Sequence, residues 1–415
     1  MDSGTDGAMA SVMPSATPDA TPDATPGAIP GAGPGGVLRL AIVSHVLHYQ
    51  HGGQLFAYGP YAREIDVWAS LFPEVVIVSP LRHAPPPADA APLGARNVAV
   101  RAFPESGGTS TAAKLWQAVR APWLAWRLWR LLGDAHAIHV RCPGNVGLLG
   151  ALVAPLRSRR LVAKYAGQWG GYAGEAATVR WQRWLLRSRW WHGPVTVYGR
   201  QPGDPAHIVP FFTASFTPQQ LARAQRAALA RAAVPVPPYR VLFVGRLSAA
   251  KRAHVVLEAV AQLPASVVSA CTIVGDGPER ARLEAQAAGD PRVRFTGALP
   301  LDDVLTQYET HDVLVLVSET EGWPKVVHEA RAFGLRVVTP HGEAGQTARP
   351  AGVPTATARP TATDVARAIA HAPPDGIAVS GNRGAAAYDL NALGNALLAL
   401  LLRAWSDPRQ VDFPE

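Results

Sequence analysis

Two glutamates stand eight positions apart in the segment SETEGWPKVVHEARAFG, residues 318–334. Pro324 suits the first position of a helix, and Gly334 suits the position just after a helix ends. We therefore expect Glu321 in the loop ahead of the helix and Glu329 on the helix itself. Two acids placed in this way can accept hydrogen bonds from different hydroxyls of one polyhydroxylated ligand. The alternative is a pair of surface acids, since an acid ahead of a helix N-terminus is favourable in any case.

A basic loop, GRLSAAK, follows the apolar run RVLFV. Gly245 permits a tight turn, Arg246 carries a fork of donors that matches a phosphate, and Lys251 falls at the start of the next helix. Backbone N–H groups at a helix N-terminus also attract anions. Lys325, in the turn after Glu321, adds a cation for the same anionic group. The loop predicts a diphosphate site, and the alternative is an ordinary turn with solvated charges.

Two glycine-containing loops follow the next apolar runs. VGDGPER holds Gly275 and Gly277, with Pro278 where a helix would begin, and VRFTG ends on Gly297. Glycines at such positions let the backbone approach a ligand closely, or they simply make a sharp turn. The VGDGPER loop does not continue as the G-x-G-x-x-G of dinucleotide-binding proteins, and the sequence has no G-x-x-x-x-G-K-S/T of P-loop proteins.

Apolar, β-branched runs alternate with helix-like segments along most of the chain. The runs lie at residues 38–43, 74–80, 137–140, 160–164 and 194–198, and then at 240–245, 271–277, 293–297, 312–318 and 336–340. A loop with Gly52 and Gly53 follows the first run, and we expect a helix over about residues 54–70. This alternation predicts an α/β protein with two doubly wound parallel sheets, which bind ligands outside the carboxyl ends of their strands.

The same pattern divides the chain into four regions. Residues 1–36 are rich in Ala, Pro, Gly and Thr and are predicted to be a disordered tail. Residues 37–233 are predicted to form a first Rossmann-like domain, and residues 234–385 a second one. The apolar segment 386–415 is predicted to be a helix that packs back on the first domain. A cleft between the domains would hold the ligands.

The composition is that of a globular protein, with 48% hydrophobic and 17% charged residues among 415. The chain lacks a run of about 18 uncharged apolar residues and a secretory signal, so we expect a soluble, cytoplasmic protein. The net charge of +8 indicates an anionic partner, such as nucleic acid, membrane headgroups or a phosphorylated substrate. Cys142 and Cys271 lie far apart in the sequence, which argues against a disulfide framework or a metal site.

Lysine is rare in this chain. Arginine supplies most of the 39 basic residues, and the four lysines are Lys114, Lys164, Lys251 and Lys325. Because lysine provides a compact ammonium where arginine provides a planar fork, these positions are candidates for a functional cation.

Taken in order, the segments above resemble the retaining family-four glycosyltransferases of GT-B fold, also described as glycosyl transferases group 1. That family carries a Gly-Arg-Leu segment with a following lysine, then V-G-x-G-P, V-x-F-x-G and S-x-x-E-G-x-P-x-x-x-x-E-A. The matching residues here are Gly245, Arg246, Leu247, Lys251, Gly275, Gly277, Pro278, Val293, Phe295, Gly297, Ser318, Glu321, Gly322, Pro324, Glu329 and Ala330. The four motifs stand in the family's order, so chance turns are a poor explanation of all four.

The resemblance implies a nucleotide-sugar donor held mainly by the second domain. Arg246 and Lys251 would stabilise the departing diphosphate, and they are the expected catalytic residues together with Glu321. Glu329 would accept hydrogen bonds from the ribose, and Glu321 from the donor sugar. The further donor-binding residues are Gly52, Gly53, Gly245, Gly275, Gly297, Gly322, Trp323, Pro324 and Lys325. Gly297 would lie near the base, and the Gly52–Gly53 loop would close over the diphosphate. Such enzymes need neither a metal nor a cofactor.

One feature of the family is missing from the first half of the chain. Members carry a His-Gly or His-Asp pair after a middle strand, where this chain reads AKYAGQWGG with Tyr165 and Ala166. Lys164 and Tyr165 are the candidate acceptor-side residues there. The usual G-G-x-x-E loop is also absent, because the corresponding segment 341–346 reads HGEAGQ.

Nine of the twelve tryptophans fall between residues 116 and 191, in the Trp/Arg-rich segments 115–131 and 179–191 and between them. In the second segment one helical stripe holds Trp181, Trp184 and Leu185, and its neighbour holds Arg180, Arg183 and Arg187. This composition is typical of a helix at a membrane interface, and the alternative is that the tryptophans face the core. A nucleic-acid partner has no recognition motif to support it, so none is predicted.

The sequence thus predicts a metal-independent, retaining hexosyltransferase at the inner face of the cell membrane. It would move a sugar from a nucleotide-diphosphate donor to a glycan or lipid-linked acceptor, as in bacterial surface polysaccharide or glycolipid synthesis. The missing histidine motivates an alternative, a non-catalytic nucleotide-sugar-binding accessory subunit of a glycosyltransferase complex. A phosphorylase or hydrolase that reuses the fold is a further alternative.

Overall fold

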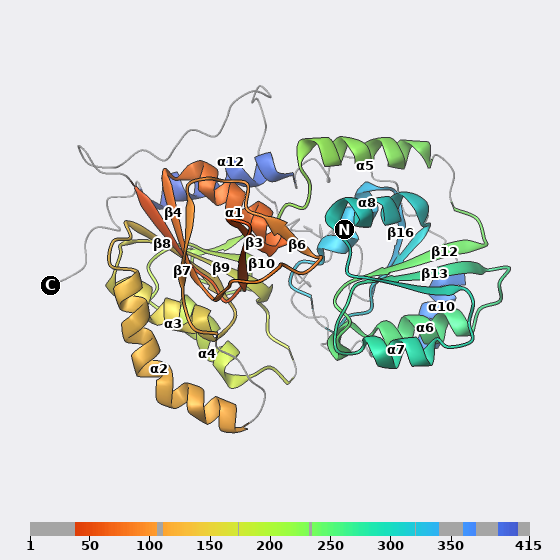
Figure 1. Ribbon diagram of the computed structural model, residues 1–415, viewed down its shortest axis with the longest axis horizontal. Helices are drawn as coiled ribbons and strands as arrows, with labels where there is room; N and C mark the ends of the chain where they lie inside the picture. The colour runs from red at the N-terminus through yellow and green to blue at the C-terminus, as the bar shows by residue number, and fades with distance from the viewer. Residues whose placement is uncertain are drawn as a thin grey trace, which may run out of the picture.

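The computed structural model describes residues 38–105, 111–172, 174–231, 235–319, 321–339, 360–370 and 389–405. They form two α/β lobes joined side by side (Figure 1). The predicted tail 1–36 and the segment 341–346 lie outside the described residues.

The first lobe is built on a seven-stranded parallel sheet of order β11-β10-β9-β8-β1-β4-β7. Its strands are β1 (Arg39–Val43), β4 (Glu74–Ser79), β7 (Val98–Ala102), β8 (Ala137–Cys142), β9 (Arg160–Gln168), β10 (Val195–Tyr198) and β11 (Ile208–Pro210). The central strands are β-branched and apolar throughout because both faces of the sheet are covered.

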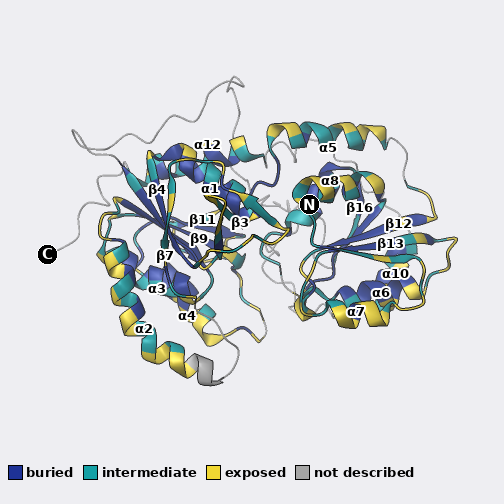
Figure 2. Cartoon of the chain, viewed as in Figure 1, coloured by how far each residue is buried: buried dark blue, intermediate teal, exposed yellow. Residues whose placement is uncertain are grey.

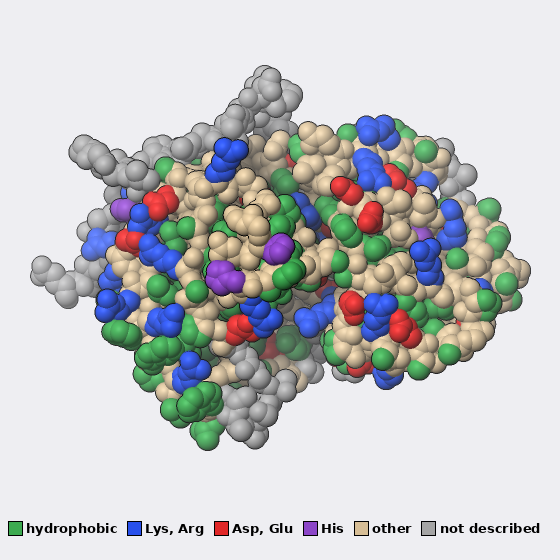
Figure 3. Space-filling model, in the orientation of Figure 1, with side chains coloured by type: hydrophobic (Ala, Val, Ile, Leu, Met, Phe, Trp, Pro, Cys, Tyr) green, Lys and Arg blue, Asp and Glu red, His purple; other side chains and the backbone are tan. Residues whose placement is uncertain are grey.

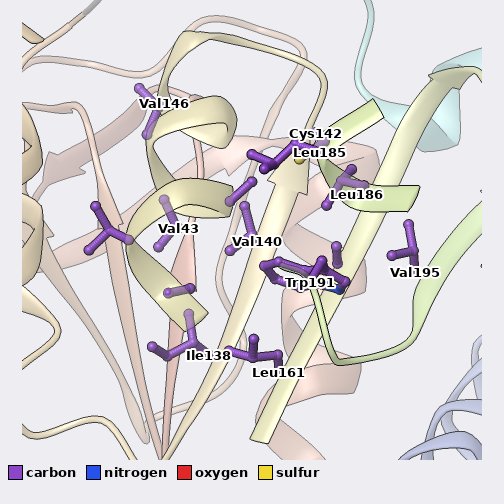
Figure 4. Packing of buried hydrophobic residues seen from close by; sticks show 14 of the residues in the cluster. Val43, Ile138, Val140, Cys142, Val146, Leu161, Leu185, Leu186, Trp191 and Val195 are labelled. Atoms are coloured by element: carbon purple, nitrogen blue, oxygen red, sulfur yellow. The ribbon is translucent and has the colours of Figure 1, made fainter. Parts of the chain in front are cut away.

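Helices cover both faces of this sheet (Figure 2). Helices α2 (Thr111–Leu131), α3 (Asn145–Val153) and α4 (Ala177–Arg187) pack on one face, and α1 (Gly59–Leu71) and α12 (Leu390–Trp405) pack on the other. Figure 4 shows the first of these cores, where Val140 and Leu161 of the strands meet Leu186 of α4 and the buried ring of Trp191. The C-terminal helix therefore completes the core of the first lobe, although it follows the second lobe in the sequence.

A β-hairpin stands where the sequence analysis placed the start of a helix. Strands β2 (His48–His51) and β3 (Gln54–Tyr58) pair antiparallel, in a small sheet of order β5-β2-β3-β6 that includes β5 (Leu81–Arg82) and β6 (Ala90–Pro92). The prediction of a helix from residue 54 was wrong by five residues. Gly52 and Gly53 both have positive φ, which is the requirement of a two-residue hairpin turn, and helix α1 begins only at Gly59.

The second lobe has a five-stranded parallel sheet of order β14-β13-β12-β15-β16. Its strands are β12 (Tyr239–Val244), β13 (Val268–Val274), β14 (Val293–Gly297), β15 (Val313–Val315) and β16 (Arg336–Val338). Helices α6 (Ala253–Ala261), α7 (Arg280–Gln286) and α10 (Ala362–Ala370) cover one face, and α5 (Pro218–Ala230), α8 (Leu301–Thr310) and α9 (Lys325–Ala332) cover the other. The prediction of two doubly wound α/β domains is confirmed.

Helix α5 packs on the second lobe, although we predicted residues 37–233 as the first domain. Its buried residues Leu221 and Ala224 enter the core that Tyr308 and Phe333 also form. The chain therefore crosses between lobes before α5, near the bridge between Phe216 and Asp389. The Pro-rich stretch that suggested a boundary at residue 234 comes after this crossing.

Candidate functional site

The loops after β12, β13 and β14 lock together through backbone hydrogen bonds. Gly245 N donates to Val274 O at 3.0 Å, and Gly275 N donates to Gly297 O at 2.8 Å. Gly275 has a φ of +133°, and a Cβ built on it would lie 2.0 Å from the carbonyl oxygen of Gly245, so only glycine fits. The carboxyl ends of these strands form one backbone surface, which is where ligands bind in such sheets.

A cation and an acid from different loops meet at this edge. Nζ of Lys251 donates to Oε1 of Glu321 at 2.5 Å, and both side chains are partly exposed. Glu319 N also donates to Ala250 O at 2.9 Å, which ties the two loops together. Arg246 is exposed on the same loop as Lys251. The edge thus presents an ammonium, a guanidinium and a carboxylate to a ligand.

The second glutamate of the pair is held in place by a tyrosine. Glu329 lies on α9 and is buried, and its Oε2 accepts a hydrogen bond of 2.9 Å from the hydroxyl of Tyr308. Burial and the Glu329 carboxylate raise the pKa of the fully buried Tyr308, so the phenol remains a donor. This contact fixes the carboxylate and orients its other oxygen, Oε1.

The two domains meet backbone to backbone at Gly322. A Cβ built on Gly322 would lie 2.8 Å from Ala166 O and 2.9 Å from Gly167 C, both at the end of β9. A side chain at Gly322 would therefore collide with the backbone of the first domain, which no rotamer change can relieve. The structure places the AKYAGQWGG segment directly against the Glu321–Gly322 loop.

Three rings bridge the domains beside this contact. Trp323 lies 5.6 Å from the ring of Tyr198, at the end of β10, and stacks on His328 of α9 at 4.4 Å. Burial lowers the pKa of His328 to about 4, and the Arg331 cation lowers it as well. His328 is therefore a neutral stacking partner of Trp323 at physiological pH.

A buried carboxylate joins two cations on the first-domain side of the seam. Glu64 of α1 accepts a hydrogen bond of 2.7 Å from Nη1 of Arg141 and one of 2.9 Å from Nζ of Lys164. All three side chains are buried. Burial alone would raise the pKa of Glu64, but the Arg141 and Lys164 cations outweigh it and lower that pKa. Glu64 thus fixes two cations that lie side by side on the neighbouring strands β8 and β9.

Lys325, the first residue of α9, lies among charges of both domains. Burial is the main reason that the pKa of its ammonium is lowered to about 7. The carboxylates of Glu64 and Glu329 raise this pKa, whereas the cations Lys164 and Arg63 lower it. Three of these four neighbours belong to the first domain. The ammonium of Lys325 therefore lies within the electrostatic field of the first domain.

Tyr165 and the Gly52–Gly53 turn do not join this cluster. Adjacent residues of a strand face opposite sides, so Tyr165 turns away from Lys164 into the first-domain core, with its ring 5.1 Å from that of Trp169. Tyr165 therefore lies in the core of the first domain, and its acceptor-side role stays a prediction. Gly52 and Gly53 form the exposed tip of the β2–β3 hairpin.

Sequence reasoning missed four residues that the structure brings to the seam. They are Glu64, Arg141, Tyr198 and Tyr308. Two of them carried a signal, because an acid inside an apolar helix and an arginine at the end of a buried strand both need a buried partner. The sequence alone does not identify those partners.

Other features of the second domain do not provide a competing site. Within the described ranges, no group of three or more His, Cys, Asp or Glu side chains could hold a metal ion. An open hollow of about 680 Å³ is lined by Arg223, Arg231, Arg240, Glu309 and Asp312, among others. It lies at the amino ends of the strands, and its acids already pair with its arginines, so we do not place the chemistry there.

Comparison with known proteins agrees with this geometry. Residues 238–372 match the family of glycosyl transferases, group 1. A solved structure of Alr3699/HepE from Anabaena, in complex with UDP and glucose, aligns over 90% of this chain and 99% of its own, with a TM-score of 0.52 at 16% identity. The chain has the GT-B fold.

Curated relatives cover the GT-B chain only in part. Sulfoquinovosyl transferase SQD2 of Arabidopsis thaliana is 33% identical over 140 residues, which are 34% of this chain and 25% of the relative. A GDP-mannose-dependent alpha-mannosyltransferase of Mycobacterium tuberculosis is 41% identical over 98 residues, which are 24% of each chain. The chain thus spans about a quarter of the length of these relatives.

A methyl group at Gly322 should hold the domains apart. Gly322→Ala places a Cβ against Ala166 O and Gly167 C, so we expect a larger radius of gyration by small-angle X-ray scattering and an unchanged circular dichroism spectrum. Gly245→Ala is the matched control, because its Cβ would meet only the Phe243 ring, at 3.7 Å. Equal radii for the two variants would contradict the close approach at Gly322.

The partly buried ammonium of Lys325 should make stability depend on pH. The pKa of Lys325 is about 7 in the folded chain and has the ordinary value of 10.5 when unfolded, so the unfolded chain binds more protons between these values and wild-type stability rises with pH there. Lys325→Met removes this dependence and should be more stable than wild type at pH 7 by about 4 kcal/mol, since each unit of pKa shift is worth about 1.4 kcal/mol.

Denaturant unfolding at pH 7, 9 and 10.5 measures the effect, since the advantage of Lys325→Met should vanish near pH 10.5. Lys325→Arg is the control that keeps its charge throughout and should stay less stable than Lys325→Met. An advantage of Lys325→Met that is independent of pH would rule out the depressed pKa.

Proposed function

We propose that this GT-B chain is a retaining, metal-independent hexosyltransferase that uses a nucleotide-diphosphate sugar. The observation that carries the proposal is the ion pair of Lys251 and Glu321 at the carboxyl edge of the sheet, opposite the first domain at Gly322, with the buried Glu329 on the helix that follows this loop. A protein of the same fold has been solved with UDP and glucose, and the matched family supports a transferase.

The diphosphate is assigned to Arg246 and Lys251. Arg246 is exposed and can bind two phosphate oxygens at once, and the backbone N–H groups of the glycine loops add donors nearby. Lys251 already bonds Glu321, so the ammonium would lie between that carboxylate and the phosphate. These fixed cations would take over the charge of the departing diphosphate, the role that a metal ion has in other transferases.

The two glutamates are assigned to different hydroxyls of the donor. Oε1 of Glu329 would accept from the ribose, because Oε2 is already held by Tyr308. Glu321 would accept from the sugar, with the backbone of Gly322, Trp323 and Pro324 beside it. Gly297 would lie near the base. The Gly52–Gly53 turn can cover the diphosphate only if the hairpin that carries it bends toward the second domain.

The transfer would proceed on one face of the sugar. The bond between the anomeric carbon and the phosphate oxygen breaks as the acceptor oxygen bonds to the same carbon. The departing phosphate oxygen takes the proton of the acceptor hydroxyl, so the sugar keeps its anomeric configuration. Arg246 and Lys251 stabilise the negative charge that develops on that phosphate.

The acceptor is assigned to the first domain, as a glycan or lipid-linked hydroxyl compound. Lys164 of β9 bonds Glu64 and lies two residues before Ala166, which contacts the loop that would hold the sugar. We place the reaction in bacterial surface polysaccharide or glycolipid synthesis, in the cytoplasm at the inner face of the membrane.

One observation favours the alternative of an accessory subunit. The position of the family's histidine is taken by Ala166, whose carbonyl packs against Gly322, so no imidazole reaches the sugar from there. Such a subunit would bind the nucleotide without turnover.

Nucleotide binding is the first test of the donor site. A thermal-shift panel of UDP, GDP and ADP should show stabilisation by at least one of them, which amounts to roughly 2.7 kcal/mol at about 100 times the dissociation constant. Lys251→Ala and Glu329→Ala should weaken that nucleotide about 10- to 100-fold, the loss expected for a hydrogen bond to a charged group. The exposed Arg226→Ala, at the other edge of the sheet, removes a charge as a control and should bind normally.

Turnover separates the enzyme from its alternatives. Sugar transfer with retained configuration, unaffected by a chelator, supports the proposal. Binding without turnover on a panel of sugars and acceptors would favour the accessory subunit. If no nucleotide shifts the unfolding temperature, the donor-site assignment is wrong.

A further inference from the structure

Helix α2 has apolar residues on two opposite sides. Leu124, Leu128 and Leu132 enter the core of the first domain. On the other side, Leu115, Trp116, Val119, Trp123 and Trp126 are all exposed, and we name them the α2 aromatic face. Folding of this chain buries only the first set. A helix needs only one apolar stripe to pack on a core, so core packing does not explain the second stripe of α2.

Hydrophobic side chains gather visibly over α2 in the space-filling view, with basic side chains among them (Figure 3). The exposed fractions of Leu115 and Val119 are 69% and 65%, and that of Trp116 is 61%. Exposed apolar patches of this kind mark interaction sites.

Arginines sit directly beside the exposed rings. The guanidinium of Arg120 lies 5.3 Å from the centre of the Trp123 ring, and that of Arg130 lies 5.3 Å from the Trp126 ring. Arg127 also lies over Trp123, at 5.5 Å. Among the described residues, no acid forms an ion pair with these three arginines, and the sequence has no Asp or Glu from residue 111 to 133. The α2 aromatic face is therefore both apolar and positively charged.

Helix α4 adds a smaller patch on the same side of the sheet. Trp181 and Trp184 are exposed there, and α4 packs beside α3, which also touches α2. Unlike the arginines of α2, two arginines of the predicted α4 stripe are paired with acids. Arg183 is buried in an ion pair with Glu175, and Arg187 pairs with Asp204. The positive charge that faces outward is thus supplied mainly by α2.

The composition of this surface decides what it binds. Tryptophan rings favour the boundary between headgroups and acyl chains, and neighbouring arginines favour anionic headgroups. A protein partner would be expected to present acids to the arginines in a fixed pattern, whereas the α2 aromatic face is a row of separate rings and charges along one helix. In the described part of the chain, no helix is both long and apolar enough to cross a membrane.

We propose that the α2 aromatic face docks the first domain on the surface of a bilayer that contains anionic lipid. Helix α2 follows β7 and returns across a parallel sheet, so its Trp116 end lies at the carboxyl edge of the strands. That edge is the one that faces the second domain. Docking by this end holds the cleft close to the lipid surface, where a lipid-linked acceptor of the proposed transferase would enter.

Vesicle co-sedimentation of the full chain tests the docking without any donor or acceptor. We expect binding to phosphatidylcholine vesicles that contain phosphatidylglycerol, much weaker binding to pure phosphatidylcholine, and weakening by salt. Each arginine near an anionic surface is worth about fivefold in affinity, so Arg120→Gln, Arg127→Gln and Arg130→Gln together should weaken binding about 100-fold.

A matched pair of variants tests the apolar contribution. Leu115→Ser with Val119→Ser should weaken vesicle binding at least tenfold. Leu229→Ser with Val236→Ser removes side chains with similar exposed fractions, 71% and 76%, from another part of the surface and should bind like wild type. Thermal unfolding checks that all these variants are folded.

Three outcomes would overturn the proposal. They are no binding to anionic vesicles at low salt, equal losses in the two apolar pairs, and self-association that Leu115→Ser with Val119→Ser abolishes while vesicle binding persists. The last result would make the face an interface between copies of the chain. Vesicle binding does not depend on nucleotide binding, so failure of the proposed transferase activity would leave this result unchanged, and the reverse also holds.

Discussion

The close approach of the two domains at Gly322 is the constraint on which the site depends. Because no side chain separates Gly322 from Ala166 and Gly167, the two sheet edges face each other at backbone distance. The consequences extend along the seam. Trp323 reaches Tyr198, and Lys325 comes into the field of Glu64 and Lys164. Charges that would be ordinary on separate domains become strongly coupled once water is excluded between them.

Coupling of this kind explains why the first-domain side needs a buried acid. Arg141 and Lys164 lie on adjacent strands, and two desolvated cations would repel each other and Lys325. Glu64 of α1 bonds both of them, so the cluster is partly neutralised while it remains net positive. A net positive seam suits an anionic ligand, and the first-domain charges of Glu64, Lys164 and Arg63 all act on Lys325.

The second-domain side of the site could be predicted from sequence because its signals are local. Each signal involves only a few consecutive residues: a turn glycine, a proline at the start of a helix, or a lysine at the start of a helix. The parallel sheet then brings the loops that carry these signals to one edge. The first-domain side could not, because Glu64 meets Lys164 across 100 positions of the chain. The separation of Tyr165 from Lys164 has the same origin. Lys164 and Tyr165 are neighbours in sequence, and the pleat of β9 sends them to opposite faces.

The errors in the predicted fold also have identifiable physical causes. The Gly52–Gly53 turn supports a hairpin. The residues after it do not alternate clearly between apolar and polar, so the helix was predicted to begin too early. Helix α5 carries few apolar residues, and only the structure shows that Leu221 and Ala224 pack on the second domain. A short apolar stripe indicates that a helix packs on other elements, but it does not identify the domain on which the helix packs.

Net charge gains a meaning once the ion pairs are known. As a property of composition alone, a net charge of +8 is equally compatible with nucleic acid, lipid or phosphate as the partner. In the structure, Arg39, Arg141 and Arg183 are neutralised by acids within the first domain. The arginines of α2 have aromatic rings beside them in place of acids. Part of the excess charge therefore lies at the seam, where a diphosphate would bind, and part lies on α2, where exposed tryptophans make lipid the better match.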